Sequence, residues 1–207
     1  VVVGGLYLLK KIFGYTSKID LSRREYQNKD AIVYFAFKLN NQYIPNYNFL
    51  EWKINENRLS LSNKIILNKI RENNAVFIHV RRGDFLSERY KKLFEGCCPI
   101  EYYQMAIQDV LEKVNQPHFF CFSDDIGWVK QHLDIPNVEY VDWNKGEDSP
   151  LDMFLMSQCK YAIMANSTFS YWGAKIRKKK KLIYYPKKWD NHPYGSPCIF
   201  YENWISY

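Results

Sequence analysis

Residues 75–85 read AVFIHVRRGDF, an apolar run that ends abruptly in two arginines, a glycine and an aspartate. The apolar part, Ala75–Val80, predicts a β-strand buried on both faces, because strands of that kind carry continuous apolar runs. Gly83 permits a tight backbone turn directly afterwards. The segment therefore predicts a central strand whose end presents charged side chains.

The chain after residue 72 alternates between strand-like and helical segments. Further strands are expected at 118–122, 138–141, 161–165 and 181–185, and helices at 100–114, 126–133, 151–159 and 169–177. Strands separated by helices of this length require right-handed crossovers and a mostly parallel sheet covered on both faces. We therefore expect an α/β, Rossmann-like domain, in which ligands bind beyond the carboxyl ends of the strands. In the helix at 100–114, the expected buried positions are Tyr103, Ile107, Val110, Leu111 and Val114.

Residues 1–71 show a different pattern, and we predict a domain boundary near residue 72. A short strand is expected at 32–38, a loop rich in Asn and Tyr at 40–57, and a helix at 60–71. The expected buried face of that helix comprises Leu61, Ile65, Ile66 and Ile70. We interpret 1–71 as the remnant of an N-terminal domain and a linker, because the chain begins with Val1. The apolar start at 1–9 is too short to cross a bilayer and lacks the features of a secretory signal.

The composition favours a packed protein with an anionic partner. Of the 207 residues, 47% are hydrophobic and 17% aromatic, which argues against disorder. The excess of 29 basic over 22 acidic residues suits a phosphorylated small molecule, a membrane surface or a nucleic acid. The longest basic cluster, 175–181, is expected at a solvated helix end, and no nucleic-acid-binding motif accompanies it. The five cysteines are odd in number and form no CxxC pair, as expected of reduced, buried thiols in a cytosolic protein.

Three polar segments follow the predicted strands, and the first is His79–Asp84. Arginine presents a fork of donors that matches phosphate oxygens, so Arg81 and Arg82 can neutralise a pyrophosphate at a strand end. The charge that develops on a nucleoside diphosphate leaving group needs such a partner. The alternative is a structural Arg–Asp pair within the turn.

The second segment is Ser123-Asp124-Asp125. Ser123 or Asp124 is expected to cap the helix that starts near Ile126, which is the commoner use of these residue types. The functional alternative is an acidic side chain that binds a base or a ribose hydroxyl. Two adjacent carboxylates without further oxygen ligands give little support for a metal site.

The third segment combines Asp152 with the stretch at 165–173, ANSTFSYWG. Ser167 and Thr168 open a helix, where free backbone N–H groups and hydroxyls form an anion site that is compatible with ordinary capping. The aromatic cluster of Phe169, Tyr171 and Trp172 is expected in the core. Asp152 is either a helix cap or dipole partner, or an acceptor for the two N–H groups of a guanine edge.

The three segments together resemble the α-1,2-fucosyltransferase family. The likeness lies in HVRRGDF, FSDDIGW and LDMFLMSQCKYAIMANSTFSYW, continues weakly through YPKKW and ENWISY, and covers about 72–207. It implies a two-domain GT-B fold in which 72–207 bind GDP-fucose. It also implies an inverting, metal-independent transfer to the 2-hydroxyl of a terminal β-galactose, without any cofactor beyond the donor.

The resemblance also implies roles for particular residues. Arg81 would contact the β-phosphate, Arg82 the loop or the phosphate, His79 and Asp152 the guanine, and Ser167 and Thr168 the phosphate oxygens. Asp124, Asn166 and Phe169 complete the expected donor-binding set. Asp84 is the candidate general base by its position, with Glu88 and a residue of a missing N-terminal part as alternatives.

This sequence departs from the family pattern in its first third. A glycine-rich segment containing GNQ is not found, and Gly4-Gly5 is its faint echo. A GDP-sugar-binding module without transferase activity is therefore one alternative, and another GDP-sugar transferase or a protein O-fucosyltransferase is a second. We expect a cytoplasmic protein of bacterial origin with no nucleic-acid partner. It would contact the inner face of a membrane peripherally at most, where lipid-linked acceptors reside.

Overall fold

The computed structural model describes residues 56–176, 181–193 and 203–207. They belong to one of two compact units into which the chain divides, 51–196 together with 200–207. The strand expected at 32–38 and most of the loop at 40–57 lie outside the described residues.

The described residues form a six-stranded parallel sheet in the order β3-β2-β1-β4-β5-β6. Its strands are β1 Asn74–Val80, β2 Pro117–Ser123, β3 Val138–Val141, β4 Tyr161–Ile163, β5 Ile183–Tyr185 and β6 Ile205–Ser206. The strands predicted after residue 72 are thus confirmed, although the fourth and fifth are shorter than expected and β6 was not expected. The strand order reverses between β1 and β4, which is where α/β sheets of this kind bind ligands.

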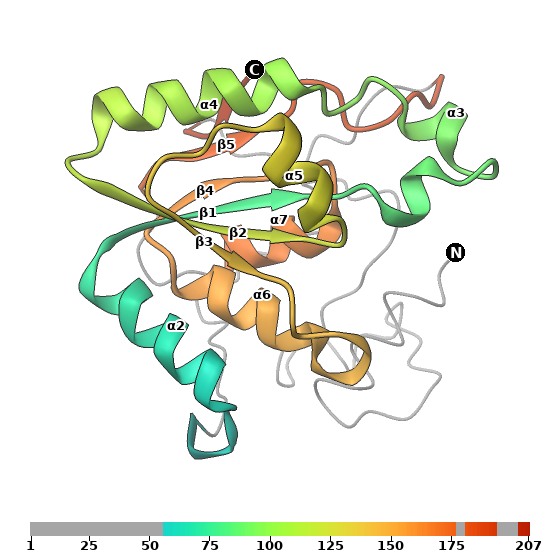
Figure 1. The fold of residues 1–207 in the computed structure, drawn as a ribbon. Helices are drawn as coiled ribbons and strands as arrows, with labels where there is room; N and C mark the ends of the chain where they lie inside the picture. Colours follow the sequence, from blue (N-terminus) through green and yellow to red (C-terminus); the bar gives the residue numbers. More distant parts are fainter. Residues whose placement is uncertain (1–55, 177–180, 194–202) are drawn as a thin grey trace, which may run out of the picture. The chain divides into compact units, whose positions relative to one another are not determined.

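Helices cover both faces of the sheet, as the alternating pattern requires (Figure 1). The longer helices are α2 Leu61–Glu72, α4 Ile100–Lys113, α5 Ile126–His132, α6 Ser149–Gln158 and α7 Thr168–Lys175. Shorter turns are η3 Glu56–Arg58, η4 Gly83–Leu86, α3 Lys91–Phe94 and η5 Gly146–Asp148. α4 and α5 lie on one face, and α2, α6 and α7 on the other, where α6 packs against both of its neighbours. No helix among the described residues is long and apolar enough to span a membrane.

The central strand is inaccessible to solvent from Ala75 to Ile78, as its apolar run predicts. In α4 the buried stripe runs through Tyr102, Tyr103, Ala106, Ile107 and Val110, so the expectation for Tyr103, Ile107 and Val110 is confirmed. Leu111 was wrongly placed in the core: it is 40% exposed, because its direction lies outside that stripe.

The buried face of α2 also differs from the expected one. Leu61 is 75% and Ile65 47% exposed, whereas Asn63 is buried beside Ile66. Compared with the expected orientation, α2 is rotated about its axis so that Asn63 faces the core. The Asn63 amide is hydrogen-bonded there to Asn144 in the loop after β3, and these bonds offset the free-energy cost of burying the amide. Hydrophobic spacing alone could not anticipate a polar residue at a core position.

Two expectations near α7 also need correction. Tyr171 and Trp172 are buried as predicted, but Phe169 is only half-buried. Lys175, expected in a solvated basic cluster, is buried: its Nζ lies 5.5 Å from the centre of the Tyr171 ring and donates a hydrogen bond to the Tyr171 hydroxyl. A lysine stem buries well against aromatic rings, and the hydroxyl satisfies its charged end.

The four described cysteines are free, in agreement with the expectation of reduced thiols. Cys97, Cys121 and Cys159 are buried. Burial raises the pKa of the Cys98 and Cys121 thiols to about 12, so neither forms a reactive thiolate near neutral pH.

Candidate functional site

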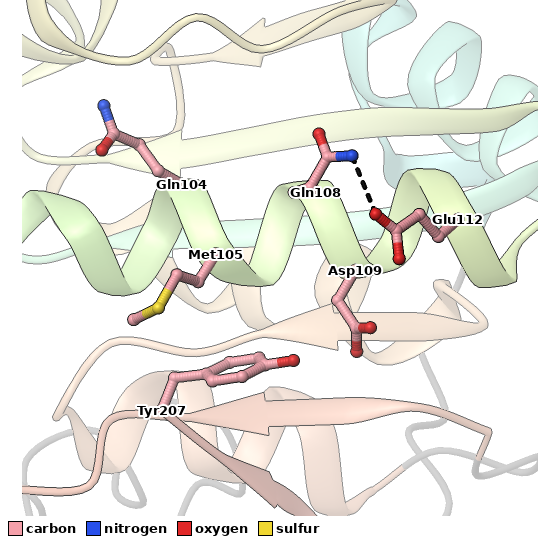
Figure 2. A pocket seen from close by; sticks show the side chains of 6 residues that line it. All are labelled: Gln104, Met105, Gln108, Asp109, Glu112 and Tyr207. Carbon is pink, nitrogen blue, oxygen red and sulfur yellow. Dashed lines mark hydrogen bonds between the residues drawn. The ribbon is translucent and has the colours of Figure 1, made fainter.

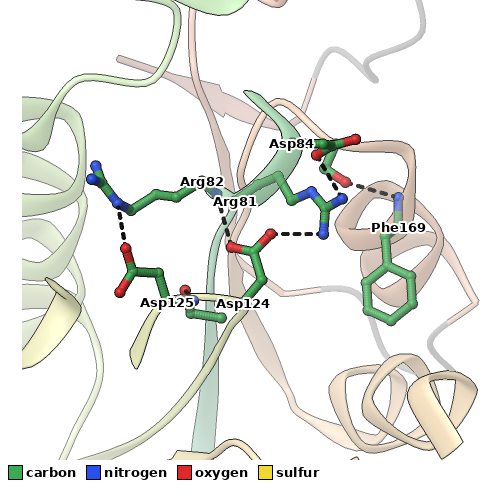
Figure 3. Close-up of polar contacts among 8 residues, drawn as sticks. Arg81, Arg82, Asp84, Asp124, Asp125 and Phe169 are labelled. Atoms are coloured by element: carbon green, nitrogen blue, oxygen red, sulfur yellow. Dashed lines mark hydrogen bonds and ion pairs between the residues drawn. The ribbon is translucent and has the colours of Figure 1, made fainter. Parts of the chain in front are cut away.

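The loop after β1 places Arg81 between two carboxylates (Figure 3). The Arg81 guanidinium lies 2.7 Å from an oxygen of Asp84 and 2.8 Å from an oxygen of Asp124. The sheet register explains the second contact: Val80 of β1 is paired with Ser123 of β2, so Arg81 and Asp124 leave the sheet at the same level. The Arg81 side chain stays 34% exposed at the carboxyl edge, where a ligand can reach it.

Asp124 is fixed in this position by the backbone of the same loop. Its second oxygen accepts a hydrogen bond from the Arg82 N–H at 2.9 Å. Gly83 passes so close that a Cβ atom there would lie 2.5 Å from Asp124 Oδ2. A larger residue at this position would therefore require the Asp124 carboxylate to move.

The predicted helix cap at Ser123 or Asp124 was wrong, since Asp125 takes this role. Asp125 Oδ1 accepts a hydrogen bond from the Trp128 N–H at 3.0 Å at the start of α5, while Ser123 Oγ accepts one from the Asp125 N–H. These contacts leave Asp124 for the arginine loop. Two adjacent aspartates look alike in sequence, and the sheet register decides which one faces β1.

Arg82 points away from Arg81 and ties the loop to α5 (Figure 3). Its Nε lies 3.1 Å from Asp125 Oδ2, and its guanidinium stacks 3.9 Å from the centre of the Trp128 ring. The hydrogen bond from the Trp128 N–H, followed by the one from Arg82, lowers the pKa of Asp125. The two arginines therefore have different roles. Arg81 presents a positive charge at the edge of the sheet, and Arg82 fixes the loop against α5.

His79 lies near the end of β1 as a buried, neutral imidazole. Burial, followed by the nearby Arg81 charge, lowers the pKa of His79 to about 3. No described residue makes a hydrogen bond to its buried Nδ1. Its ring centre lies 5.6 Å from that of Phe169, which brings the end of β1 and the start of α7 together.

The start of α7 contains the expected hydroxyl residues. Ser167 is the N-cap, and its Oγ accepts a hydrogen bond from the Phe169 N–H at 3.3 Å. Thr168 is exposed. Asn166, in contrast, is buried and donates to the Trp189 carbonyl at 2.9 Å, so its side chain is engaged within the fold.

Asp152 lies in the first turn of α6, which begins beyond the carboxyl end of β3. Its Oδ1 accepts a hydrogen bond from Asn144 at 2.7 Å. Burial raises the pKa of Asp152 to about 7, against the opposing effect of the Asn144 hydrogen bond, and the charge of Asp142 raises it further. No capping hydrogen bond from a described backbone N–H reaches Asp152, and no described contact joins it to Arg81.

Two further observations delimit the site. Within the described ranges, no group of three or more His, Cys, Asp or Glu side chains is arranged to hold a metal ion. A hollow on the outer side of α4 contains none of the predicted site residues (Figure 2); Gln104, Met105, Gln108, Asp109, Glu112 and Tyr207 line it. The carboxyl edge of the sheet therefore remains the candidate site.

Comparison with known proteins identifies the family. The sequence profile of glycosyl transferase family 11 matches residues 20–207. The chain belongs to this family. The family 11 chain is 38% identical over 143 residues to the O-antigen biosynthesis glycosyltransferase WbnK of Escherichia coli, which covers 67% of this chain and 47% of WbnK.

Two other relatives carry more specific names. An alpha-1,2-colitosyltransferase of Escherichia coli is 34% identical over 171 residues, covering 79% of this chain and 56% of the relative. The galactoside alpha-(1,2)-fucosyltransferase 2 of Hylobates lar is 30% identical over 110 residues, covering 52% and 32% of the two chains. The family 11 chain thus spans about half the length of the first two relatives. No solved structure matches it.

Proposed function

We propose that this chain contains the donor-binding part of an α-1,2-fucosyltransferase. The reaction would move fucose from GDP-fucose to the 2-hydroxyl of a terminal β-galactose on a glycan, with inversion and without a metal ion. The observation that carries the proposal is Arg81, held between Asp84 and Asp124 at the carboxyl edge next to the topological switch point. Family membership and the α-1,2 specificity named in two relatives support it.

In the proposed mechanism, Arg81 stabilises the leaving diphosphate. Charge accumulates on the β-phosphate as the bond to the sugar breaks, and a preorganised guanidinium stabilises that charge without moving. Its two carboxylate partners hold the guanidinium plane in advance of binding. Arg82 contributes indirectly, because it fixes the loop on α5.

The guanine would be recognised by His79 and Asp152. His79 is neutral and its buried Nδ1 has no hydrogen-bond partner among the described residues, so a base that reaches this nitrogen would exchange a hydrogen bond with it. Asp152 offers carboxylate oxygens to guanine N–H groups. Ser167 and Thr168, at the start of α7, would hold phosphate oxygens.

The proposed acceptor step needs a base for the 2-hydroxyl proton. Asp84 is our candidate, because its side chain is 53% exposed beside Arg81. Glu88 and a residue in the N-terminal part of the protein are the alternatives. The acceptor glycan would be engaged outside the donor site.

The identity of the sugar has one specific alternative. A relative named for colitosyl transfer is more similar to this chain than the fucosyltransferase compared above. Incubation of the chain with GDP-fucose or nucleotide-linked colitose and a β-galactoside, followed by mass spectrometry of the glycan, distinguishes the two donors. The product of fucose transfer is heavier than the product of colitose transfer by the mass of one oxygen atom, because colitose has one oxygen fewer than fucose.

Calorimetric titration tests the donor site directly. We expect the 207-residue chain to bind GDP more tightly than ADP in the absence of divalent metal. Arg81→Ala should weaken GDP binding at least tenfold, the loss expected when a charge-assisted contact to phosphate is removed. Arg71→Ala is the matched control, because Arg71 pairs with Glu56 on the surface.

The outcomes separate the proposed function from its alternatives. Equal affinity for GDP and ADP would contradict guanine recognition. Selective GDP binding without transfer to any β-galactoside would favour a GDP-sugar-binding module. Transfer of a sugar to a peptide hydroxyl would instead favour a protein O-fucosyltransferase.

A further inference from the structure

Asp152 lies at one end of a buried network of hydrogen bonds that joins α2 to α6. Asn63 of α2 and Asn144 of the loop after β3 exchange two hydrogen bonds, at 2.8 and 2.9 Å. Trp143 Nε1 donates to Asn63 Oδ1 at 2.9 Å, and Asn144 Nδ2 donates to Asp152 Oδ1 at 2.7 Å. Both asparagines are more than nine-tenths buried.

The indole of Trp143 determines the direction of every hydrogen bond in this network. An indole N–H can only donate, so Asn63 must present its oxygen toward Trp143. The Asn63 amide nitrogen then faces Asn144 Oδ1, which leaves the Asn144 amide nitrogen to donate. A flip of either amide would place donor against donor.

The consequence is that Asp152 is held as an acceptor. Oδ1 receives one hydrogen bond from Asn144 and keeps a second lone pair. No residue that the structure describes donates to Oδ2. In the ionised carboxylate, Oδ1 and Oδ2 are two adjacent acceptors, which suit a base edge with two adjacent N–H donors. Guanine offers such an edge, whereas adenine offers one donor beside an acceptor that a carboxylate repels.

We propose that Trp143, Asn63 and Asn144 are positioning residues that orient Asp152 as an acceptor and thereby set a preference for a guanine nucleotide. The inference rests on the proposed function, because it takes Asp152 as the residue that reads the base. It assigns a role in donor selection to α2, a helix that none of the sequence motifs contains.

The pKa of Asp152 provides a way to test the network without nucleotide. Burial raises the pKa of Asp152, the hydrogen bond from Asn144 lowers it, and the charge of Asp142 raises it. Loss of the Asn144 hydrogen bond should raise the pKa of Asp152, because that bond favours the ionised form. Asp142→Asn should lower it without touching the network.

The first experiment measures the pKa of Asp152 in the nucleotide-free chain by carbon-13 NMR titration. We expect Asn144→Leu and Asn63→Leu to raise this pKa. Trp143→Phe, which removes the indole N–H but keeps an aromatic ring, should raise it less. Asn68→Leu is the matched control, since Asn68 is an exposed position of the same helix. An unchanged pKa of Asp152 in both Asn63→Leu and Trp143→Phe would overturn the inference that the network orients Asp152.

The second experiment measures GDP and ADP affinities of the same variants by calorimetry. We expect Asn144→Leu and Asn63→Leu to weaken GDP binding about tenfold, the loss of one hydrogen bond to a charged group. ADP binding should change less than twofold. Equal weakening for both nucleotides would overturn the selective role, because it would indicate a general disturbance of the fold.

The two experiments distinguish a failure of the inference from a failure of the proposed function. If the pKa responds to the network but the unaltered chain binds GDP no better than ADP, the proposed base recognition is wrong and the selective role falls with it. If the unaltered chain prefers GDP but the variants keep that preference, the proposed function stands and the positioning role is overturned.

Discussion

Asp124 holds Arg81 at the edge of the sheet while it is itself held by the Arg82 backbone. One oxygen of Asp124 lies 2.8 Å from the Arg81 guanidinium, and the other accepts the Arg82 N–H at 2.9 Å. The carboxylate thereby connects β2 to the loop after β1. This relationship makes the position of Arg81 depend on a carboxylate that follows β2 and on the backbone of the arginine loop.

Gly83→Ala should disturb this arrangement. The new Cβ would lie 2.5 Å from Asp124 Oδ2, so the carboxylate must move and Arg81 loses a partner. We expect GDP affinity to fall about tenfold by calorimetry, because small misplacements of a phosphate-binding group are costly.

Gly127→Ala is the matched control for that substitution. The nearest atom to a Cβ at Gly127 lies 3.9 Å away, and the residue belongs to α5, where alanine is favoured over glycine by about 1 kcal/mol. GDP affinity should be unchanged there. Equal affinities in the two variants would contradict the role assigned to Gly83.

Asp84→Asn should separate binding from turnover. The asparagine oxygen can still accept a hydrogen bond from Arg81, so the guanidinium stays in place, while the loss of the negative charge leaves the Arg81 charge more available. GDP affinity should therefore stay equal or rise a few-fold. If Asp84 is the general base, turnover in a radiolabelled fucose transfer assay should fall by roughly 10²-fold or more. Glu88→Gln is the comparison variant, and a larger loss of turnover there would transfer the role to Glu88.

Asp152→Asn should change how stability depends on pH. The folded-state pKa of about 7 is above the model-peptide value of 3.8, so the native protein binds more protons than the unfolded chain between these values. The contribution of Asp152 to the free energy of unfolding therefore falls as the pH rises from 4 to 7, by at most about 1.4 kcal/mol per pH unit. The variant should lack this component.

Urea denaturation at pH 5, 6, 7 and 8 checks this prediction. The difference in unfolding free energy between the variant and the unaltered chain should increase from pH 5 to 7 in favour of the variant, and then level off. Parallel pH profiles would show that Asp152 titrates near its ordinary value.

Asp125→Ala should destabilise the domain more than the loss of a simple cap. The substitution removes the cap of α5, worth about 1 kcal/mol, and also releases Arg82 from its carboxylate partner. Ser60→Ala is the control, because Ser60 caps α2 through the Asn63 N–H without an ion pair. A smaller loss of stability in Asp125→Ala than in Ser60→Ala, by urea midpoints, would refute the prediction.

Much of the fold could be predicted from local patterns. The apolar run at 75–80 and its successors became parallel strands, because strands covered on both faces need apolar side chains throughout. Errors arose where a polar residue enters the core, as with Asn63, or where an apolar residue stays exposed, as with Leu61. β6 was not predicted because a strand of two residues is too short to show a hydrophobic periodicity.

For the candidate site, the sequence located the segments but not their partners. The arginine loop, the adjacent aspartates and the start of α7 follow β1, β2 and β4, as the alternation of strands and helices predicted. The exchange of roles between Asp124 and Asp125 was not predictable. It follows from the pairing of Val80 with Ser123, which no local pattern encodes.

The sequence by itself determined a parallel α/β sheet and the placement of charged residues at its carboxyl edge, because hydrophobic periodicity and strand polarity are local properties. Tertiary structure alone decided which residues meet. Arg82 bonds to a side chain 42 positions away, and Asn63 to one 81 positions away. Such contacts depend on strand register and on the rotation of a helix about its axis. Both are set by packing across the whole domain, which is why the support of Arg81 and the orientation of Asp152 appear only in the folded chain.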